Sequence, residues 1–229
     1  MSRALPARPM LIVALTGGIA TGKSVVARFL EERGCAVHSA DRAAHEVMMP
    51  GGPAWKSLTA HFGPRILNPD QTINRPRLGA IVFAHEAERR FLNSVVHPLV
   101  LRKKKEIVAR LEREKKTEIF ISEAALTIEA GYAGFFDKVI VVFCRPEVQL
   151  ARLMARDGFS REAALQKIGA QMSQQEKKRQ ADYLIDTSGS LSDTESRTDK
   201  VFRRLKRDYA EKEKKKTGSI SSRRPAGAA

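Results

Sequence analysis

A glycine-rich segment constrains this chain more than any other feature. It reads Gly-Gly-Ile-Ala-Thr-Gly-Lys-Ser over residues 17–24 and fits the pattern G-x-x-x-x-G-K-[ST]. An apolar run at residues 10–15 precedes it, and apolar residues at helical spacing follow it. A strand, a glycine-rich turn and a helix in this order form a loop whose backbone N–H groups can surround a phosphate. The segment is therefore predicted to bind the phosphates of ATP or GTP.

Each residue type in this loop suits polyphosphate binding. The glycines let the backbone approach the ligand, Lys23 can reach the β- and γ-phosphates, and the Ser24 hydroxyl can bind Mg²⁺. Mg²⁺ is the predicted cofactor, with Ser24 as a ligand and Glu123 as a candidate that acts through water. The candidate ATP-binding residues of the loop are Gly17, Gly18, Ile19, Ala20, Thr21, Gly22, Lys23 and Ser24.

Strand and helix patterns alternate along much of the remaining chain. Helical patterns cover residues 147–156 and 161–179 and begin again at about residue 192, whereas further strand patterns occur at residues 36–40, 118–123, 137–143 and 183–186. Residues 41–113 show only helical patterns, interrupted by Pro and Gly. Such alternation favours a parallel sheet covered on both faces. The predicted fold class is α/β, three-layered around a central parallel sheet, with a helical insertion after the second strand.

Composition excludes several classes of protein. The chain has 229 residues, of which 42% are hydrophobic and 29% charged, so wholesale disorder is excluded. No apolar run approaches the roughly 18 residues that cross a bilayer, and the N-terminus does not read as a secretory signal. Cys35 and Cys144 lie far apart without a CxxC partner, which indicates neither a disulfide framework nor a zinc site. We expect a cytoplasmic protein.

The positive charge is concentrated at the C-terminus. Residues 201–229 carry ten Lys or Arg against three Asp or Glu, out of a net charge of +15. Residues 206–229 are expected to be a basic, disordered tail. A nucleic-acid-binding protein that uses this tail remains an alternative, although aromatic residues make up only 6% of the chain. That alternative predicts salt-sensitive binding that is lost when residues 205–229 are deleted.

Other positions narrow the reaction class. The sequence has no NKxD-like motif for guanine recognition, which disfavours a GTPase. The strand at residues 118–123 ends in a single Glu rather than in Asp-Asp or Asp-Glu, which disfavours a motor ATPase. Arg152 and Arg156 are four apart, hence on one helix face, where arginines can hold a transferring phosphoryl group. Asp41 follows the second strand and can accept a proton from an acceptor hydroxyl or cap the next helix. The pattern indicates a small-molecule kinase.

Several separated motifs resemble the dephospho-coenzyme A kinase family. The loop with its flanking Leu15, the segment Ser39-Ala-Asp-Arg-Ala-Ala-His45, and the block Glu123-Ala-Ala-Leu-Thr-Ile-Glu-Ala-Gly131 are similar to family motifs. The resemblance runs from about residue 10 to residue 189. Further matches lie at Pro50-Gly51, Phe62-Gly63, Arg75-Pro-Arg-Leu78 with Phe83, His97-Pro98, Gln149, Arg152 to Asp157, Gln171, Lys177 and Ala181-Asp182. The chain departs from the family pattern at Ser39, Ala125, Thr127, Lys167 and Thr187.

The resemblance implies transfer of the γ-phosphoryl group of ATP to the ribose 3′-hydroxyl of dephospho-coenzyme A. It implies catalytic roles for Lys23, Asp41 and Arg152, and ATP binding by Arg156. The implied substrate-binding residues are Thr16, Asp41, His45, Arg75, His97 and Glu129. ATP and dephospho-coenzyme A are then the partners, with neither a nucleic acid nor a membrane among them. We expect a monomer, with an oligomer as the alternative. A nucleotide or nucleoside kinase with another acceptor remains an alternative.

The implied domain organisation is a kinase domain over residues 10–205. Residues 10–40 and 114–205 would form its nucleotide-binding core, and residues 147–180 would include a helical lid. Residues 41–113 would be the helical insertion that binds the coenzyme.

Overall fold

The computed structural model describes residues 10–114, 116–125, 127–129, 131 and 133–221. The chain divides into two compact units. The first, which we call the sheet unit, comprises the described residues up to His38 and those from Leu111 onward. The second, the helical unit, comprises Ser39–Arg110. The helical unit corresponds, to within three residues at each end, to the insertion expected at residues 41–113.

A five-stranded sheet forms the centre of the sheet unit, in the order β2-β3-β1-β4-β5. The strands are β1 (Leu11–Gly17), β2 (Ala36–Ser39), β3 (Ile119–Glu123), β4 (Lys138–Phe143) and β5 (Tyr183–Asp186). Strand β1 pairs in parallel with β3 and β4, and β4 pairs in parallel with β5. The predicted α/β class is confirmed, and so are the predicted strands.

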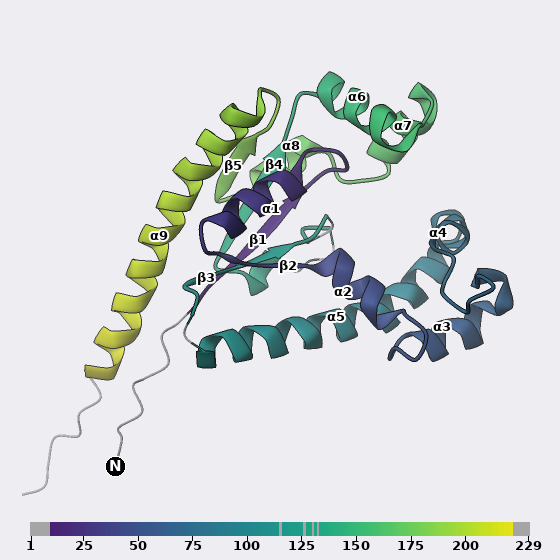
Figure 1. Cartoon of the computed structure of the whole chain (residues 1–229), viewed down its shortest axis with the longest axis horizontal. Helices are drawn as coiled ribbons and strands as arrows, with labels where there is room; N and C mark the ends of the chain where they lie inside the picture. Colours follow the sequence, from purple (N-terminus) through teal and green to yellow (C-terminus); the bar gives the residue numbers. More distant parts are fainter. Residues whose placement is uncertain (1–9, 115, 126, 130, 132, 222–229) are drawn as a thin grey trace, which may run out of the picture. The chain divides into compact units, whose positions relative to one another are not determined.

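Both faces of the sheet are covered, as the apolar strand sequences require. Alternate residues of β1 point to opposite faces, so Leu11, Val13 and Leu15 join one cluster and Ala14 joins another. The first cluster includes α1 (Lys23–Glu32) and α9 (Leu191–Ser221), which run beside the sheet in Figure 1. On the other face, Met172 and Ala181 pack against the second cluster. The unit therefore has three layers.

The lid region contains three helices where two were predicted. These are α6 (Pro146–Asp157), α7 (Arg161–Gly169) and α8 (Gln174–Arg179). The predicted continuous helix at residues 161–179 is wrong because Ser173 starts a new helix. The Ser173 side chain accepts a hydrogen bond from the backbone N–H of Glu176, whose carboxylate accepts one from the N–H of Ser173. This capping box satisfies backbone groups that a continuous helix would have bonded internally.

The C-terminal region differs from the disordered tail expected from residue 206. Helix α9 continues through Ser221, and residues 222–229 of the expected tail lie outside the described residues. Leu205 is fully buried and Tyr209 is 5% exposed, both in the cluster of the sheet. Lys212 donates to the carbonyl of Met10 and pairs with Asp137 at 2.5 Å. The continuation of α9 beyond residue 205 was not predicted, because this part of the sequence is basic and its apolar positions are few and widely spaced.

Replacing Leu205 should measure how strongly α9 is anchored. We expect Leu205→Ala to lower the free energy of unfolding by about 2–4 kcal/mol, because it leaves a cavity in a fully buried site. Urea unfolding checks the value, with the exposed Arg207→Ala as a control that should change it by less than about 0.5 kcal/mol. Equal effects of the two substitutions would mean that α9 contributes little to the core.

The helical unit has its own core. Its helices are α2 (Ala40–Val47), α3 (Trp55–Phe62), α4 (Arg75–Ala84) and the greater part of α5 (Glu86–Glu114). Phe62 is buried in this core and Trp55 packs against it, while the Trp55 indole donates to the carbonyl of Gln71 at 2.9 Å. Apart from Ser39, which ends β2, the described residues of this unit contain no strand and only an isolated bridge between Leu67 and Ile73.

Pro98 lies within α5 rather than at one of its ends. A helix can continue through a proline at the cost of one backbone hydrogen bond. Here Val96, Leu99 and Val100 on either side of it pack into the core of the helical unit, which offsets that cost.

In the part of the chain that the structure describes, no helix is both long and apolar enough to cross a membrane.

Candidate phosphate-binding site

The glycine-rich loop connects β1 to α1, as the sequence predicts. Its first glycine, Gly17, lies at the end of β1, where a Cβ atom would be 2.2 Å from the carbonyl oxygen of Val142 on β4. Gly22 precedes α1 with φ of +84°, a left-handed conformation that favours glycine. These two positions explain why the loop needs glycine at both ends. The N-terminus of α1 directly follows, where the helix dipole favours a bound anion.

Lys23 is folded over the loop. Its ammonium group donates to the carbonyl oxygens of Gly17 at 3.0 Å and of Gly18 at 2.9 Å. The Thr21 hydroxyl donates to the carbonyl of Gly18 at 2.9 Å, which braces the same turn. The positive charge of Lys23 is thus held within the loop, where a phosphate would be bound.

Two glutamines from the lid region hold the middle of the loop. Gln149 of α6, which is 3% exposed, donates to the carbonyl of Ile19 at 2.8 Å. Gln171, between α7 and α8, accepts from the N–H of Ile19, also at 2.8 Å. The next residue, Ala20, has φ of +58°, which costs a non-glycine residue free energy. The two bonds at Ile19 therefore help to maintain a strained loop conformation.

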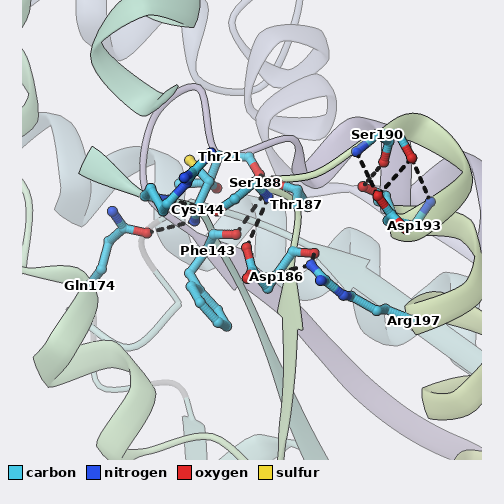
Figure 2. A network of polar contacts seen from close by, with 12 residues as sticks. Thr21, Phe143, Cys144, Gln174, Asp186, Thr187, Ser188, Ser190, Asp193 and Arg197 are labelled. Atoms are coloured by element: carbon cyan, nitrogen blue, oxygen red, sulfur yellow. Dashed lines mark hydrogen bonds and ion pairs between the residues drawn. The ribbon is translucent and has the colours of Figure 1, made fainter. Parts of the chain in front are cut away.

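Gln149 is itself fixed by Gln174 of α8. The Gln174 amide donates to Gln149 at 2.8 Å and accepts from the backbone N–H of Cys144 at 3.0 Å (Figure 2 shows the second bond). The amides of Gln149 and Gln174 thus form a chain of hydrogen bonds from the end of β4 to Ile19.

Replacing Gln149 should weaken the loop and its ligand together. We expect Gln149→Leu to lower the free energy of unfolding by about 1–3 kcal/mol, since it leaves the carbonyl of Ile19 and the amide of Gln174 without their bonds. ATP affinity should fall as the loop loses its fixed conformation. Urea unfolding and ATP titration measure both effects, with the exposed Gln166→Leu as a control. Unchanged ATP affinity would show that the bond at Ile19 does not maintain the loop.

Arg152 of α6 is connected to the loop by hydrogen bonds through Thr187. Its guanidinium donates to the hydroxyl of Thr187 at 3.1 Å and to its carbonyl at 2.7 Å. The Thr187 hydroxyl in turn donates to the carbonyl of Thr21 in the loop at 2.8 Å, as Figure 2 shows. Arg156, by contrast, makes two 2.8 Å bonds to the carboxylate of its neighbour Asp157. The two arginines that the spacing placed on one face thus have different partners.

Cys144 lies beside Arg152 and Thr187, and its thiol is not activated as a nucleophile. It is 3% exposed, and burial raises the pKa of its thiol. A neutral thiol is a poor nucleophile. Both Cys144 and Cys35 are buried and without a disulfide, in agreement with the sequence prediction.

The predicted substrate residues of the sheet unit lie near the ends of β1 and β3. Thr16 is fully buried, and its hydroxyl donates to the carbonyl of Ala125 at 3.2 Å. The same carbonyl accepts from Lys177 at 2.9 Å, and Lys177, fully buried, pairs with Glu129 at 2.5 Å. Glu123 ends β3, in register with Leu15 of β1. Lys177 therefore ties α8 to the segment after β3, where Glu129 lies.

In the helical unit, Asp41 lies in the first turn of α2 and is exposed. It is not the helix cap, because the side chain of Ser39 accepts from the N–H of Arg42 instead. The capping alternative for Asp41 is therefore wrong, which leaves its carboxylate available to a ligand. His45 lies in the last turn of α2 and is also exposed.

The other two candidates of this unit lie on different helices. Arg75 is the first residue of α4, after the cap Asn74, and is exposed. His97 is half-buried in α5, and burial lowers the pKa of its imidazole, which is therefore neutral near pH 7. A neutral imidazole can donate and accept one hydrogen bond each.

Sequence reasoning did not assign a role to Gln149, Gln174 or Thr187. Glutamine and threonine are common on helices and in loops, and although Gln149 matches the family pattern and Thr187 departs from it, the sequence alone does not indicate what either side chain contacts. Gln149 and Thr187 contact the loop because the fold brings together residues more than 100 positions apart, and Gln174 acts on the loop through its bond to Gln149.

Comparison with known proteins gives a consistent result. The family model described as dephospho-CoA kinase matches residues 11–193. The dephospho-CoA kinase of Syntrophus aciditrophicus is 36% identical over 223 residues, which cover 95% of both chains. That of Carboxydothermus hydrogenoformans is 41% identical over 204 residues, covering 88% of this chain and 98% of the relative.

Solved structures agree in fold. The structure of TT1252 from Thermus thermophilus has a TM-score of 0.75 and 30% sequence identity. The match covers 86% of this chain and 98% of the TT1252 chain. Dephospho-CoA kinase from Campylobacter jejuni has a TM-score of 0.62 and 30% identity, with 85% and 96% of the two chains covered. Together with the glycine-rich loop and the lid arginine, these matches establish that the chain belongs to the dephospho-CoA kinase family.

Proposed function

We propose that this protein transfers the γ-phosphoryl group of ATP to the ribose 3′-hydroxyl of dephospho-CoA, yielding CoA and ADP. The family match over residues 11–193 carries this proposal, because it includes both the glycine-rich loop and the helical unit. In this assignment the loop binds the phosphates of ATP, and the helical unit binds the acceptor.

The residues of the sheet unit supply charge rather than covalent chemistry. Phosphoryl transfer passes through a loose transition state that needs alignment and neutralisation of negative charge. Lys23 is held within the loop, and Arg152 is tied to the loop by Thr187. We assign both to the phosphates of ATP, with Arg156 as a further ATP-binding residue once its bonds to Asp157 are exchanged.

The donor atoms of the loop region fit a magnesium ion. The Ser24 hydroxyl follows Lys23 at the start of α1, and the carboxylate of Glu123 ends the strand that pairs with β1. Mg²⁺ prefers such oxygen ligands and retains several waters. Ser24 would bind it directly and Glu123 through water, and the ion supplies charge neutralisation at the β- and γ-phosphates.

On the acceptor side, we assign Asp41 to the 3′-hydroxyl. Its carboxylate is exposed and takes no part in capping α2, so it can orient the hydroxyl and accept its proton. We assign binding of the remaining substrate to His45, Arg75, His97, Thr16 and Glu129.

An acceptor panel tests the proposed reaction. ADP release is followed with ATP and Mg²⁺ and one acceptor at a time: dephospho-CoA, AMP, CMP or adenosine. We expect kcat/KM for dephospho-CoA to exceed the others by at least about a hundredfold, since a site that hydrogen-bonds its substrate discriminates against acceptors that lack the bonded groups. A faster reaction with AMP or CMP would identify a nucleotide kinase instead.

We propose that the enzyme acts as a cytoplasmic monomer that needs no nucleic acid or membrane.

A further inference from the structure

The Thr187 side chain occupies a junction between three parts of the sheet unit. Its hydroxyl accepts from the Arg152 guanidinium at 3.1 Å and lies 2.8 Å from the carbonyl oxygen of Thr21 and 3.3 Å from that of Phe143. A hydroxyl has one proton and two lone pairs, so it donates to one carbonyl, the nearer being that of Thr21, while it accepts from Arg152. The residue is 2% exposed, so water cannot replace these bonds.

The backbone of Thr187 strengthens the same junction. Its N–H donates to the carbonyl of Phe143 at 2.9 Å, which fixes Thr187 to the end of β4, and its own carbonyl accepts the second Arg152 bond at 2.7 Å (Figure 2 shows the contacts with Phe143 and Thr21). The side chain also lies against the loop, since a Cβ atom at Gly22 would be 3.4 Å from the Thr187 hydroxyl oxygen. Arg152, β4 and the residues before Lys23 are thus joined through one threonine.

We propose that Thr187 is a positioning residue that sets the Arg152 guanidinium against the phosphate-binding loop. The proposal rests on the proposed function, in which Arg152 neutralises charge on the transferred phosphoryl group. The two bonds to Thr187 use two of the five N–H groups of the guanidinium, and the planar fork keeps the others in a fixed direction. Because electrostatic catalysis depends on donors held in place before the reaction, the hydroxyl of Thr187 contributes to rate without touching ATP.

The test compares two substitutions at this position with a matched control. Thr187→Val keeps the branched shape and removes the hydroxyl, whereas Thr187→Ser keeps the hydroxyl. Thr198→Val removes another fully buried threonine hydroxyl, on α9, which donates within its own helix to the carbonyl of Thr194. We expect Thr187→Val to lower kcat by about 10- to 100-fold, as a misplaced catalytic group does. Its KM for dephospho-CoA should change less than about twofold, Thr187→Ser should retain a third or more of kcat, and Thr198→Val should not alter it.

A double-mutant cycle with Arg152→Lys separates positioning from a general loss of structure. Lysine lacks the fork that Thr187 holds, so Thr187→Val should cost less than about threefold in kcat in that background. Equal losses in both backgrounds, or a Thr187→Val enzyme as fast as Thr187→Ser, would overturn the proposal.

The same cycle is measured on the Kd for MgATP, which needs no acceptor. There we expect Thr187→Val to weaken binding by about 3- to 10-fold with Arg152 and by less than about twofold with lysine. If the wild-type enzyme fails to phosphorylate dephospho-CoA, the proposed function is wrong, and the coupling in Kd still decides the role of Thr187. Absence of that coupling would overturn the role of Thr187 independently.

Discussion

Lys23→Ala is expected to lower kcat by about 10²–10³-fold while leaving the fold intact. The ammonium donates to the loop carbonyls of Gly17 and Gly18, so it lies within the loop, and Lys23 is not a member of the apolar core of the sheet unit. Its charge is therefore available to the developing charge of the phosphoryl group. Removal of one preorganised electrostatic group typically costs a reaction this much.

Steady-state ADP release measures the effect of Lys23→Ala, and thermal unfolding shows whether the protein remains folded. Lys200→Ala removes an exposed lysine from α9 and should behave like the wild type in both measurements. Retention of more than half of the wild-type rate by Lys23→Ala would remove the loop lysine from the mechanism.

Asp41→Asn is expected to lower kcat by about 10²–10⁴-fold, the usual contribution of a positioned general base. Asparagine has nearly the same shape but cannot accept the proton of the 3′-hydroxyl. Because Ser39 rather than Asp41 caps α2, the substitution should leave the helix in place. The free energy of unfolding should therefore change by less than about 0.5 kcal/mol.

Ser39→Ala provides the reciprocal control for Asp41. It removes the side chain that accepts from the N–H of Arg42, so stability should fall by about 1 kcal/mol while the Asp41 carboxylate remains. Turnover per folded molecule should stay within a few-fold of the wild type. If Asp41→Asn were nearly as fast as the wild type, the acceptor-side mechanism would need another residue.

Much of the fold could be predicted because local patterns determined it. The apolar run before the loop is buried on both faces of a parallel sheet, which is the environment such runs require. Residues 17–24 form a strand-to-helix loop because glycine at two positions permits a conformation and a close approach that other residues resist. The helical unit, Ser39–Arg110, overlaps the segment 41–113, in which the sequence shows no strand pattern.

Features decided by tertiary contacts could not be predicted. Helix α9 was missed beyond residue 205 because its basic sequence resembles a solvated tail, yet Leu205 and Tyr209 anchor it to the sheet unit. Pro98 lies inside α5, where the packing of its apolar neighbours offsets the backbone hydrogen bond that a proline cannot make. The residues that hold the loop, Gln149 and Thr187, come from distant segments, and only the fold brings them to it.

The most direct test of the central claim follows the phosphoryl group itself. The enzyme is incubated with Mg²⁺, dephospho-CoA and ATP labelled at the γ-phosphate, and the products are separated and treated with a phosphatase specific for ribose 3′-phosphates. We expect the label to move to CoA and the 3′-specific phosphatase to remove all of it. Label that appears as inorganic phosphate, or on an acceptor position that resists this phosphatase, would contradict the account.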